Sequence, residues 1–167
     1  MTMKVIIGAS TLALIAAIAF WPGSSSSAEG DWLSYSEAIQ KAGGTKRIVL
    51  VDVYTDWCGW CKKMDRDVYA DKDVQAVLGE YFVTAKLDAE SATKHPFQGE
   101  SATEREIAKS FGITGYPTTL FLTEDGEAIT ILPGYIPKET FLQVLSYIHT
   151  RAYETQSWEE FVKNQKS

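Results

Sequence analysis

The only two cysteines of this 167-residue chain, Cys58 and Cys61, are separated by two residues. They follow a strand-like apolar run, residues 48–54, and stand where a helix is expected to begin. A helix N-terminus carries unpaired N–H groups and a partial positive charge, which favour a thiolate over a thiol. Because the thiolate is the form that attacks a disulfide, this placement predicts thiol–disulfide exchange.

Two other uses of the cysteine pair are less favoured. A structural disulfide over two intervening residues closes a very short loop, so it removes little entropy from the unfolded chain. A zinc site needs four ligands, and the two histidines, His95 and His149, lie far from the cysteines in the sequence. We therefore expect a redox pair with no bound metal and no cofactor.

The first 28 residues have the pattern of an export signal. Lys4 precedes an apolar run at residues 5–21, and Pro22, Gly23 and four serines follow it. A basic start, an apolar core and small residues before a cut after Ala28 are typical of a cleaved signal peptide. The run is at the short end of the ~17–25 residues that span a bilayer, so an uncleaved membrane anchor is the alternative. In either case we expect a periplasmic or otherwise exported protein, which contacts a membrane only if this segment is retained.

The rest of the chain suits one domain, which we place at residues 29–154, with a C-terminal tail at residues 155–167 that forms at most a short helix. The whole chain has 16 Lys and Arg against 22 Asp and Glu. An acidic domain without a basic stripe argues against nucleic acid as a partner. We expect a monomer whose partners are proteins.

Hydrophobic periodicity predicts an α/β domain with a mixed central sheet flanked by helices. Strands are expected at residues 48–54, 81–87, 118–123 and 128–132, the last two joined by an Asp-Gly turn. Helices are expected from residue 34 to a stop at Gly43-Gly44, from residue 58 with a break near residue 71, at residues 107–111, from residue 137, and for a turn or two around Trp158. Residues 88–103 are polar and interrupted by Pro96 and Gly99, which predicts a surface loop.

Three segments in the same order give the chain a resemblance to the thioredoxin superfamily over about residues 31–150. They are VLVDVYTDWCGWCK at residues 49–62, VTAKLD at 83–88 and GITGYPT at 112–118. The run WCGWCKKM is similar to exported bacterial thioredoxin-like proteins, among them relatives of the periplasmic domain of the transmembrane disulfide reductase. The resemblance implies a thioredoxin fold. Trp60 departs from ordinary thioredoxin, which has proline at that position, and this changes the dipeptide that tunes the redox potential in the family.

The catalytic roles are assigned as follows. Cys58 is nearer the start of the helix and is expected to be the attacking thiolate, and Cys61 the resolving thiol. Asp52 lies inside an apolar strand, so its pKa is expected to rise and make it a proton acceptor near neutral pH. The resemblance implies that Asp52 deprotonates the resolving thiol with Lys86 as its neighbour; the alternative is a solvated carboxylate at a strand edge.

The resemblance also implies the residues that meet the substrate. Trp57 packs beside the cysteines, and Gly59-Trp60 between them offers apolar contact to a protein substrate. Pro117 is the candidate cis-proline, and the backbone of Tyr116 pairs with an extended substrate segment. Gly134 matches a glycine that leaves room near the site.

The leading hypothesis is an exported thiol–disulfide oxidoreductase, a reductase rather than an oxidase, because its motif is thioredoxin-like. In an oxidising compartment a reductase needs electrons, for which a membrane disulfide reductase is the expected donor. Its substrates would be exported proteins that contain cysteines. Two other classes stay open: a redox-inactive binding module or chaperone, and a copper-delivery protein, although copper carriers on this fold resemble Cys-x-x-x-Cys.

Overall fold

The computed structural model describes residues 32–165, so the predicted signal or anchor at residues 1–28 lies outside the described residues. The central sheet has four strands, β1 (Ile48–Tyr54), β2 (Phe82–Asp88), β5 (Thr118–Leu122) and β6 (Ala128–Pro133). Their order is β2-β1-β5-β6. β1 and β2 are parallel, and β5 is antiparallel to both β1 and β6. The predicted mixed sheet is confirmed.

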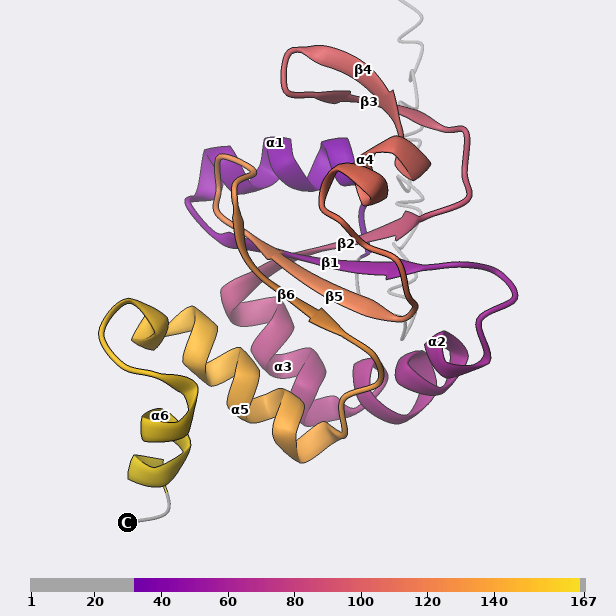
Figure 1. Cartoon of the computed structure of the whole chain (residues 1–167). Coiled ribbons are helices and arrows are strands. Elements are labelled where there is room, and N and C mark those ends of the chain that lie inside the picture. Colours follow the sequence, from indigo (N-terminus) through magenta and orange to yellow (C-terminus); the bar gives the residue numbers. More distant parts are fainter. Residues whose placement is uncertain (1–31, 166–167) are drawn as a thin grey trace, which may run out of the picture.

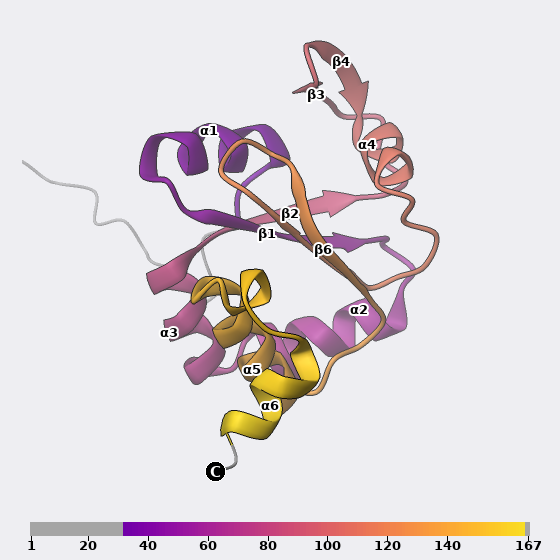
Figure 2. The same cartoon turned by 60° about the vertical axis from the view of Figure 1, so that its left-hand side comes forward.

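Helices cover both faces of this sheet. In chain order they are α1 (Tyr35–Thr45), α2 (Gly59–Met64), the π-helical turn η1 (Asp65–Tyr69), α3 (Lys72–Tyr81), α4 (Glu104–Ser110), α5 (Lys138–His149), the 3₁₀ turn η2 (Ala152–Glu154) and α6 (Trp158–Gln165). α1 and α4 lie on one face, and α2, α3 and α5 lie on the other (Figure 1). The second view shows the same layers, with α6 beside α5 (Figure 2).

Strand β1 is buried on both faces, which explains its continuous apolar sequence. Because side chains alternate along a strand, Val49, Val51 and Val53 enter the core beneath α1 and α4. Ile48 and Leu50 enter the opposite core, with α3 and α5. Asp52 continues the second series, so its carboxyl group points toward the layer that contains the cysteine-bearing helix.

The prediction that Gly43-Gly44 ends the first helix is wrong. The capping box formed by Ser34 and Glu37 is present, but α1 continues through both glycines to Thr45. The helix ends at Lys46, which has a φ of 57° and donates its N–H to the Ala42 carbonyl at 2.7 Å. Each glycine costs a helix about 1 kcal/mol, and the packing of the buried α1 face outweighs that cost.

The predicted surface loop at residues 88–103 contains a β-hairpin, so that prediction is wrong. Strands β3 (Lys94–Phe97) and β4 (Glu100–Thr103) pair antiparallel. The buried imidazole of His95 anchors the hairpin, with Nδ1 2.9 Å from Ser36 Oγ and Nε2 3.0 Å from Glu104 Oε1. Four-residue strands and a proline within β3 gave the polar segment the pattern of a loop.

The C-terminal tail packs back onto the domain as α6. The rings of Trp158 and Phe161 lie 5.5 and 5.0 Å from the ring of Tyr147 on α5. None of the helices at residues 32–165 is long and apolar enough to cross a membrane.

Candidate active site

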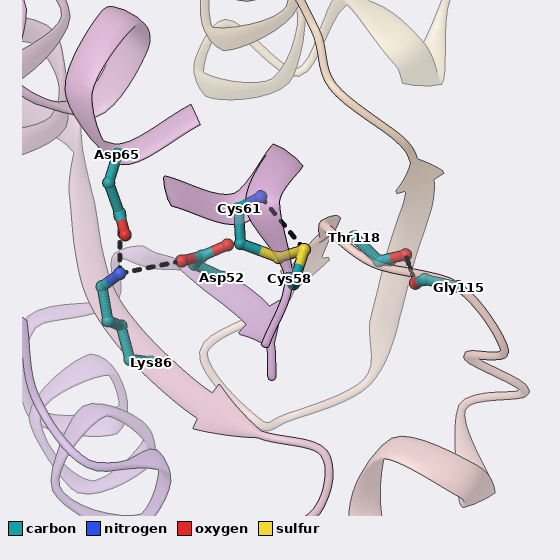
Figure 3. The surroundings of a disulfide bond; sticks show 7 residues. All are labelled: Asp52, Cys58, Cys61, Asp65, Lys86, Gly115 and Thr118. Atoms are coloured by element: carbon teal, nitrogen blue, oxygen red, sulfur yellow. Dashed lines mark hydrogen bonds and ion pairs between the residues drawn. A yellow bond between two sulfur atoms is a disulfide. The ribbon is translucent and has the colours of Figure 1, made fainter. Parts of the chain in front are cut away.

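The two cysteines form a disulfide at the start of α2 (Figure 3). Cys58 is the N-cap residue, and its Sγ accepts a hydrogen bond from the Cys61 N–H at 3.0 Å. Cys58 and Cys61 are similarly buried, at 4% and 3% exposure, so exposure does not distinguish their roles. The N-cap position does, because the free N–H groups of the first turn stabilise a thiolate on Cys58 more than on Cys61.

Asp52 is the buried carboxyl group behind the cysteines, at 1% exposure. It is opposite Lys86 in the parallel register of β1 and β2, and Lys86 Nζ donates to its Oδ2 at 3.1 Å. Burial raises the pKa of Asp52 to about 6, even though the positive charge of Lys86 acts to lower it. In Figure 3 the carboxyl group extends between Lys86 and Cys61. A carboxylate with this pKa is suited to accept a proton near neutral pH.

Lys86 lies between two carboxylates and two aromatic rings. Its Nζ is 2.6 Å from Asp65 Oδ1, closer than to Asp52. The rings of Trp32 and Tyr54 lie 5.3 and 5.1 Å from the same nitrogen. Burial acts to lower the pKa of Lys86, but the charges of Asp52 and Asp65 outweigh it and raise that pKa. Lys86 is therefore a fixed positive charge at the edge of the buried carboxyl group.

Asp65 and Trp32 are site residues that sequence reasoning missed. Asp65 begins the π-turn η1, where the Ala70 N–H bonds to its carbonyl at 2.9 Å, and such turns often occur at functional sites. A signal for Asp65 was present, because it follows Cys61 by four residues and so shares its helix face. Trp32 adjoins a segment with the composition of a linker, and nothing in the sequence associates it with Lys86.

Tyr69 on η1 is a buried neighbour of Asp52. Its hydroxyl group lies 3.2 Å from Thr119 Oγ1 on β5. Burial raises the pKa of Tyr69 well above its usual value, and the nearby charge of Asp52 adds to that effect. Tyr69 therefore remains a neutral phenol beside the Asp52 carboxyl group.

Two exposed tryptophans flank the disulfide. Trp57 and Trp60 are 66% and 59% exposed, an unusual state for so large an apolar side chain. The Trp57 ring contacts Tyr116 edge-on with centroids 6.1 Å apart, and the Trp60 ring lies 5.6 Å from Tyr135. The sequence did not predict Tyr135 as a site residue, since it lies 75 positions beyond Trp60. Only the fold brings the two rings together.

A shallow hollow separates these aromatic pairs. It measures about 350 Å³ and is lined by Trp60, Tyr116, Pro117, Gly134 and Tyr135. The peptide bond between Tyr116 and Pro117 is cis, and the Pro117 carbonyl accepts the Gly134 N–H at 2.8 Å. The hollow can seat an apolar side chain of a bound peptide beside the disulfide.

Gly59 keeps the surface above the cysteines open. A methyl group at this position would find no other atom within 4 Å, so steric crowding does not require a glycine. A larger side chain would project from the exposed start of α2, beside the cysteines. Within the described range, no three His, Cys, Asp or Glu side chains are placed to hold a metal ion.

Comparison with known proteins agrees with this fold and site. Residues 35–149 match the family model described as a thioredoxin-like domain. The thiol:disulfide interchange protein DsbD of Ralstonia nicotianae is 33% identical over 110 residues, which cover 65% of this chain and 17% of that protein. The chain spans about a sixth of the length of the curated relatives it matches.

Solved structures show the same fold. A thioredoxin-fold protein from Helicobacter pylori superposes with a TM-score of 0.64 at 22% identity, over 73% of this chain and 81% of that one. A thioredoxin from Thermus thermophilus gives 0.60 at 26% identity, over 72% and 87%. The chain belongs to the thioredoxin-like domain family, and it has the Cys-x-x-Cys pair of the thiol–disulfide oxidoreductases of that family.

Proposed function

We propose that this chain is an exported thiol–disulfide reductase that acts on cysteines of other exported proteins and is recharged by a membrane disulfide reductase. The observation that carries the proposal is the cysteine pair at the start of α2 with the buried, ion-paired carboxyl group of Asp52 behind it. That arrangement supplies both an activated nucleophile and an acceptor for the second thiol proton.

The reaction transfers two electrons in two exchange steps. The Cys58 thiolate attacks a substrate disulfide, forms a mixed disulfide and releases one substrate sulfur as a thiolate. Cys61 then gives its proton to Asp52 and attacks the Cys58 sulfur. The second substrate sulfur leaves as a thiolate and takes up a proton, while Cys58 and Cys61 form their own disulfide. The substrate is reduced, and a dithiol donor must reduce this disulfide before the next cycle.

Reductive direction and export are supported by the sequence and by relatives. The Trp-Cys-Gly-x-Cys motif is that of thioredoxins, and the signal-like pattern at residues 1–28 supports export. DsbD, whose name describes thiol:disulfide interchange, is similar over one segment of a much longer protein. Because exported compartments keep cysteines oxidised, the reductase needs a membrane donor rather than the cytosolic thiol pool.

Reduction of insulin disulfides by the full chain tests the activity. The oxidised protein is first reduced and separated from free thiols, and then mixed with insulin in a single turnover. We expect insulin reduction by the wild type and none by Cys58→Ala. Ser101→Ala, which changes an exposed hydroxyl group on β4, is the matched control and should behave as the wild type. If Cys58→Ala reduces insulin as fast as the wild type, the catalytic role of Cys58 is refuted, and a binding module becomes the favoured function.

A further inference from the structure

Residues Trp32 and Leu33, called the N-terminal arm below, are attached to the outer edge of β2 beside Lys86. The Leu33 N–H donates to the Thr84 carbonyl at 3.0 Å, and the Lys86 N–H donates to the Leu33 carbonyl at 3.1 Å. These two bonds form a parallel bridge between Leu33 and Ala85. The arm therefore holds the backbone of Lys86, and the side chain of Lys86 reaches Asp52.

The side chain of Trp32 contacts two residues next to Asp52, namely Lys86 and Tyr69. Its ring lies 5.3 Å from Lys86 Nζ, and its edge-on contact with the Tyr69 ring has a centroid distance of 4.9 Å. Tyr69 itself adjoins Asp52. Trp32 thus contacts two neighbours of the buried carboxyl group, Lys86 and Tyr69, although it lies 26 positions before Cys58 in the sequence.

We infer that Trp32 is a positioning residue for the exchange reaction: its ring holds the Lys86 ammonium group beside the Asp52 carboxylate that takes the proton of Cys61. The inference rests on the proposed function for its catalytic meaning. The contacts of Trp32 with Lys86 and Tyr69, which support the inference, exist whether or not the protein catalyses disulfide exchange.

The physical reason is a competition for Lys86. Asp65 Oδ1 is the nearer acceptor at 2.6 Å, and its side chain is 43% exposed, whereas that of Asp52 is 2% exposed. A flexible lysine would favour the hydrated carboxylate, because an ammonium group loses less hydration there. The rings of Trp32 and Tyr54 attract the cation and restrict its rotamers, which keeps Nζ within reach of both carboxylates.

The groups that face Asp52 and can alter its charge come from several elements. Lys86 on β2 favours the ionised carboxylate, and Asp65 on η1 opposes it. Tyr69 on η1 also interacts with Asp52, Cys61 lies beside its carboxyl group and becomes a titratable thiol on reduction, and Tyr54 borders Lys86. Loss of the Trp32 ring weakens the Lys86 contribution, which lowers the pKa of Asp52, so the predicted effect has a definite sign.

The test compares Trp32→Leu, which keeps an apolar side chain but removes the ring, with Trp32→Phe, which keeps a ring. Two readouts are used on the full chain: the pH dependence of single-turnover insulin reduction, and the carbon-13 NMR titration of the Asp52 carboxyl group. We expect Trp32→Leu to raise both midpoints by about half a pH unit, and Trp32→Phe to stay near the wild type. Trp158→Leu, a half-buried tryptophan on α6, is the matched control and should shift neither.

A double-mutant cycle shows whether Trp32 acts through Lys86. In a Lys86→Met background, Trp32→Leu should leave the Asp52 midpoint unchanged. An equal shift in both backgrounds, or no shift in the wild-type background, overturns the inference. The NMR titration needs no turnover, so a chain that fails to reduce insulin would refute the proposed function while the titration still decides the role of Trp32.

Discussion

Lys86 hydrogen-bonds Asp52 directly across the parallel β1–β2 pair, with Nζ 3.1 Å from a carboxyl group that is 1% exposed. The two residues share one register position, so the regular sheet determines the separation of their backbones. The charge pair therefore stands on rigid elements, while the cysteines occupy the adjoining loop and helix. This division suits a site in which the Asp52 carboxyl group must keep a constant proton affinity while the cysteine sulfurs exchange bonding partners.

The buried carboxyl group of Asp52 should reduce stability at neutral pH. Its pKa is about 6 in the folded protein, above the ~3.9 of an unfolded aspartate. The folded state therefore binds more protons between these values, and the free energy of unfolding falls as the pH rises from about 4 to about 6. Above about pH 6 the ionised Asp52 lowers the free energy of unfolding by about 3 kcal/mol at most.

The replacement Asp52→Asn removes this cost. We expect it to raise the free energy of unfolding at pH 7.5 by up to about 3 kcal/mol, and the wild-type and variant curves to converge toward pH 4. Urea denaturation of the oxidised protein at several pH values measures this. Asp125→Asn, at an exposed turn residue, is the control and should follow the wild type at every pH. A loss of stability at pH 7.5 in Asp52→Asn would contradict the account.

Asp52→Asn should also slow the reaction. Without the acceptor for the Cys61 proton, the resolving step loses its general base, an effect of about 100-fold or more. The first attack by Cys58 does not need that proton transfer. Stopped-flow measurement of both steps should therefore show a selective loss in resolution, and an equal loss in both steps would argue against the assigned role.

Lys86 and Asp65 should move the acid limb of the pH–rate profile in opposite directions. Lys86→Met removes the charge that lowers the pKa of Asp52, so the midpoint should rise above the wild-type value. Asp65→Asn removes a charge that raises that pKa, so the midpoint should fall. Lys109→Met, an exposed lysine on α4, is the control. Shifts of the same sign in the first two variants would show that they do not act through Asp52.

Trapping of a mixed disulfide should separate the two cysteines. With Cys61→Ser, attack by Cys58 proceeds but resolution does not, so a covalent complex with insulin should accumulate on a non-reducing gel. With Cys58→Ser no such complex is expected. The reverse pattern would identify Cys61 as the attacking residue and contradict the role of the N-cap position.

The aromatic pair Trp60 and Tyr135 should contribute to substrate binding rather than to chemistry. Because the pair borders the hollow beside the disulfide, Trp60→Ala or Tyr135→Ala should raise the KM for a protein disulfide about 5- to 10-fold. The rate with a small disulfide such as oxidised glutathione should change little. Tyr81→Ala, another exposed aromatic residue, is the control. A drop confined to kcat would place the pair in the reaction itself.

The sequence predicts the framework of the site well. The run at residues 48–54, which is rich in β-branched residues, coincides with β1, because a strand covered on both faces has few alternatives. Alternation along that strand then places Asp52 toward the cysteine-bearing layer. The helix break near Asp71 was also predictable, since Asp71 caps α3 with its side chain.

The rest of the site depends on contacts between distant segments. Asp65 reaches Lys86 across 21 positions, and Trp32 reaches it from the edge of a segment that resembles a linker. Local propensity contains no information about such pairs. The β3–β4 hairpin escaped prediction for a related reason, because contacts with distant segments stabilise it: the hydrogen bonds of buried His95 and the packing of Phe97 against Tyr35 and Phe111.

The reduction potential of the Cys58–Cys61 pair tests the central claim most directly. The oxidised full chain is equilibrated with glutathione redox buffers, and the fraction of dithiol is measured by alkylation and mass spectrometry. Each change of about 30 mV alters the equilibrium constant tenfold, so the classes are well separated. If the chain is a reductase, we expect a reduction potential near that of thioredoxin, about −270 mV. A value above about −150 mV, toward the strong oxidants, would contradict it.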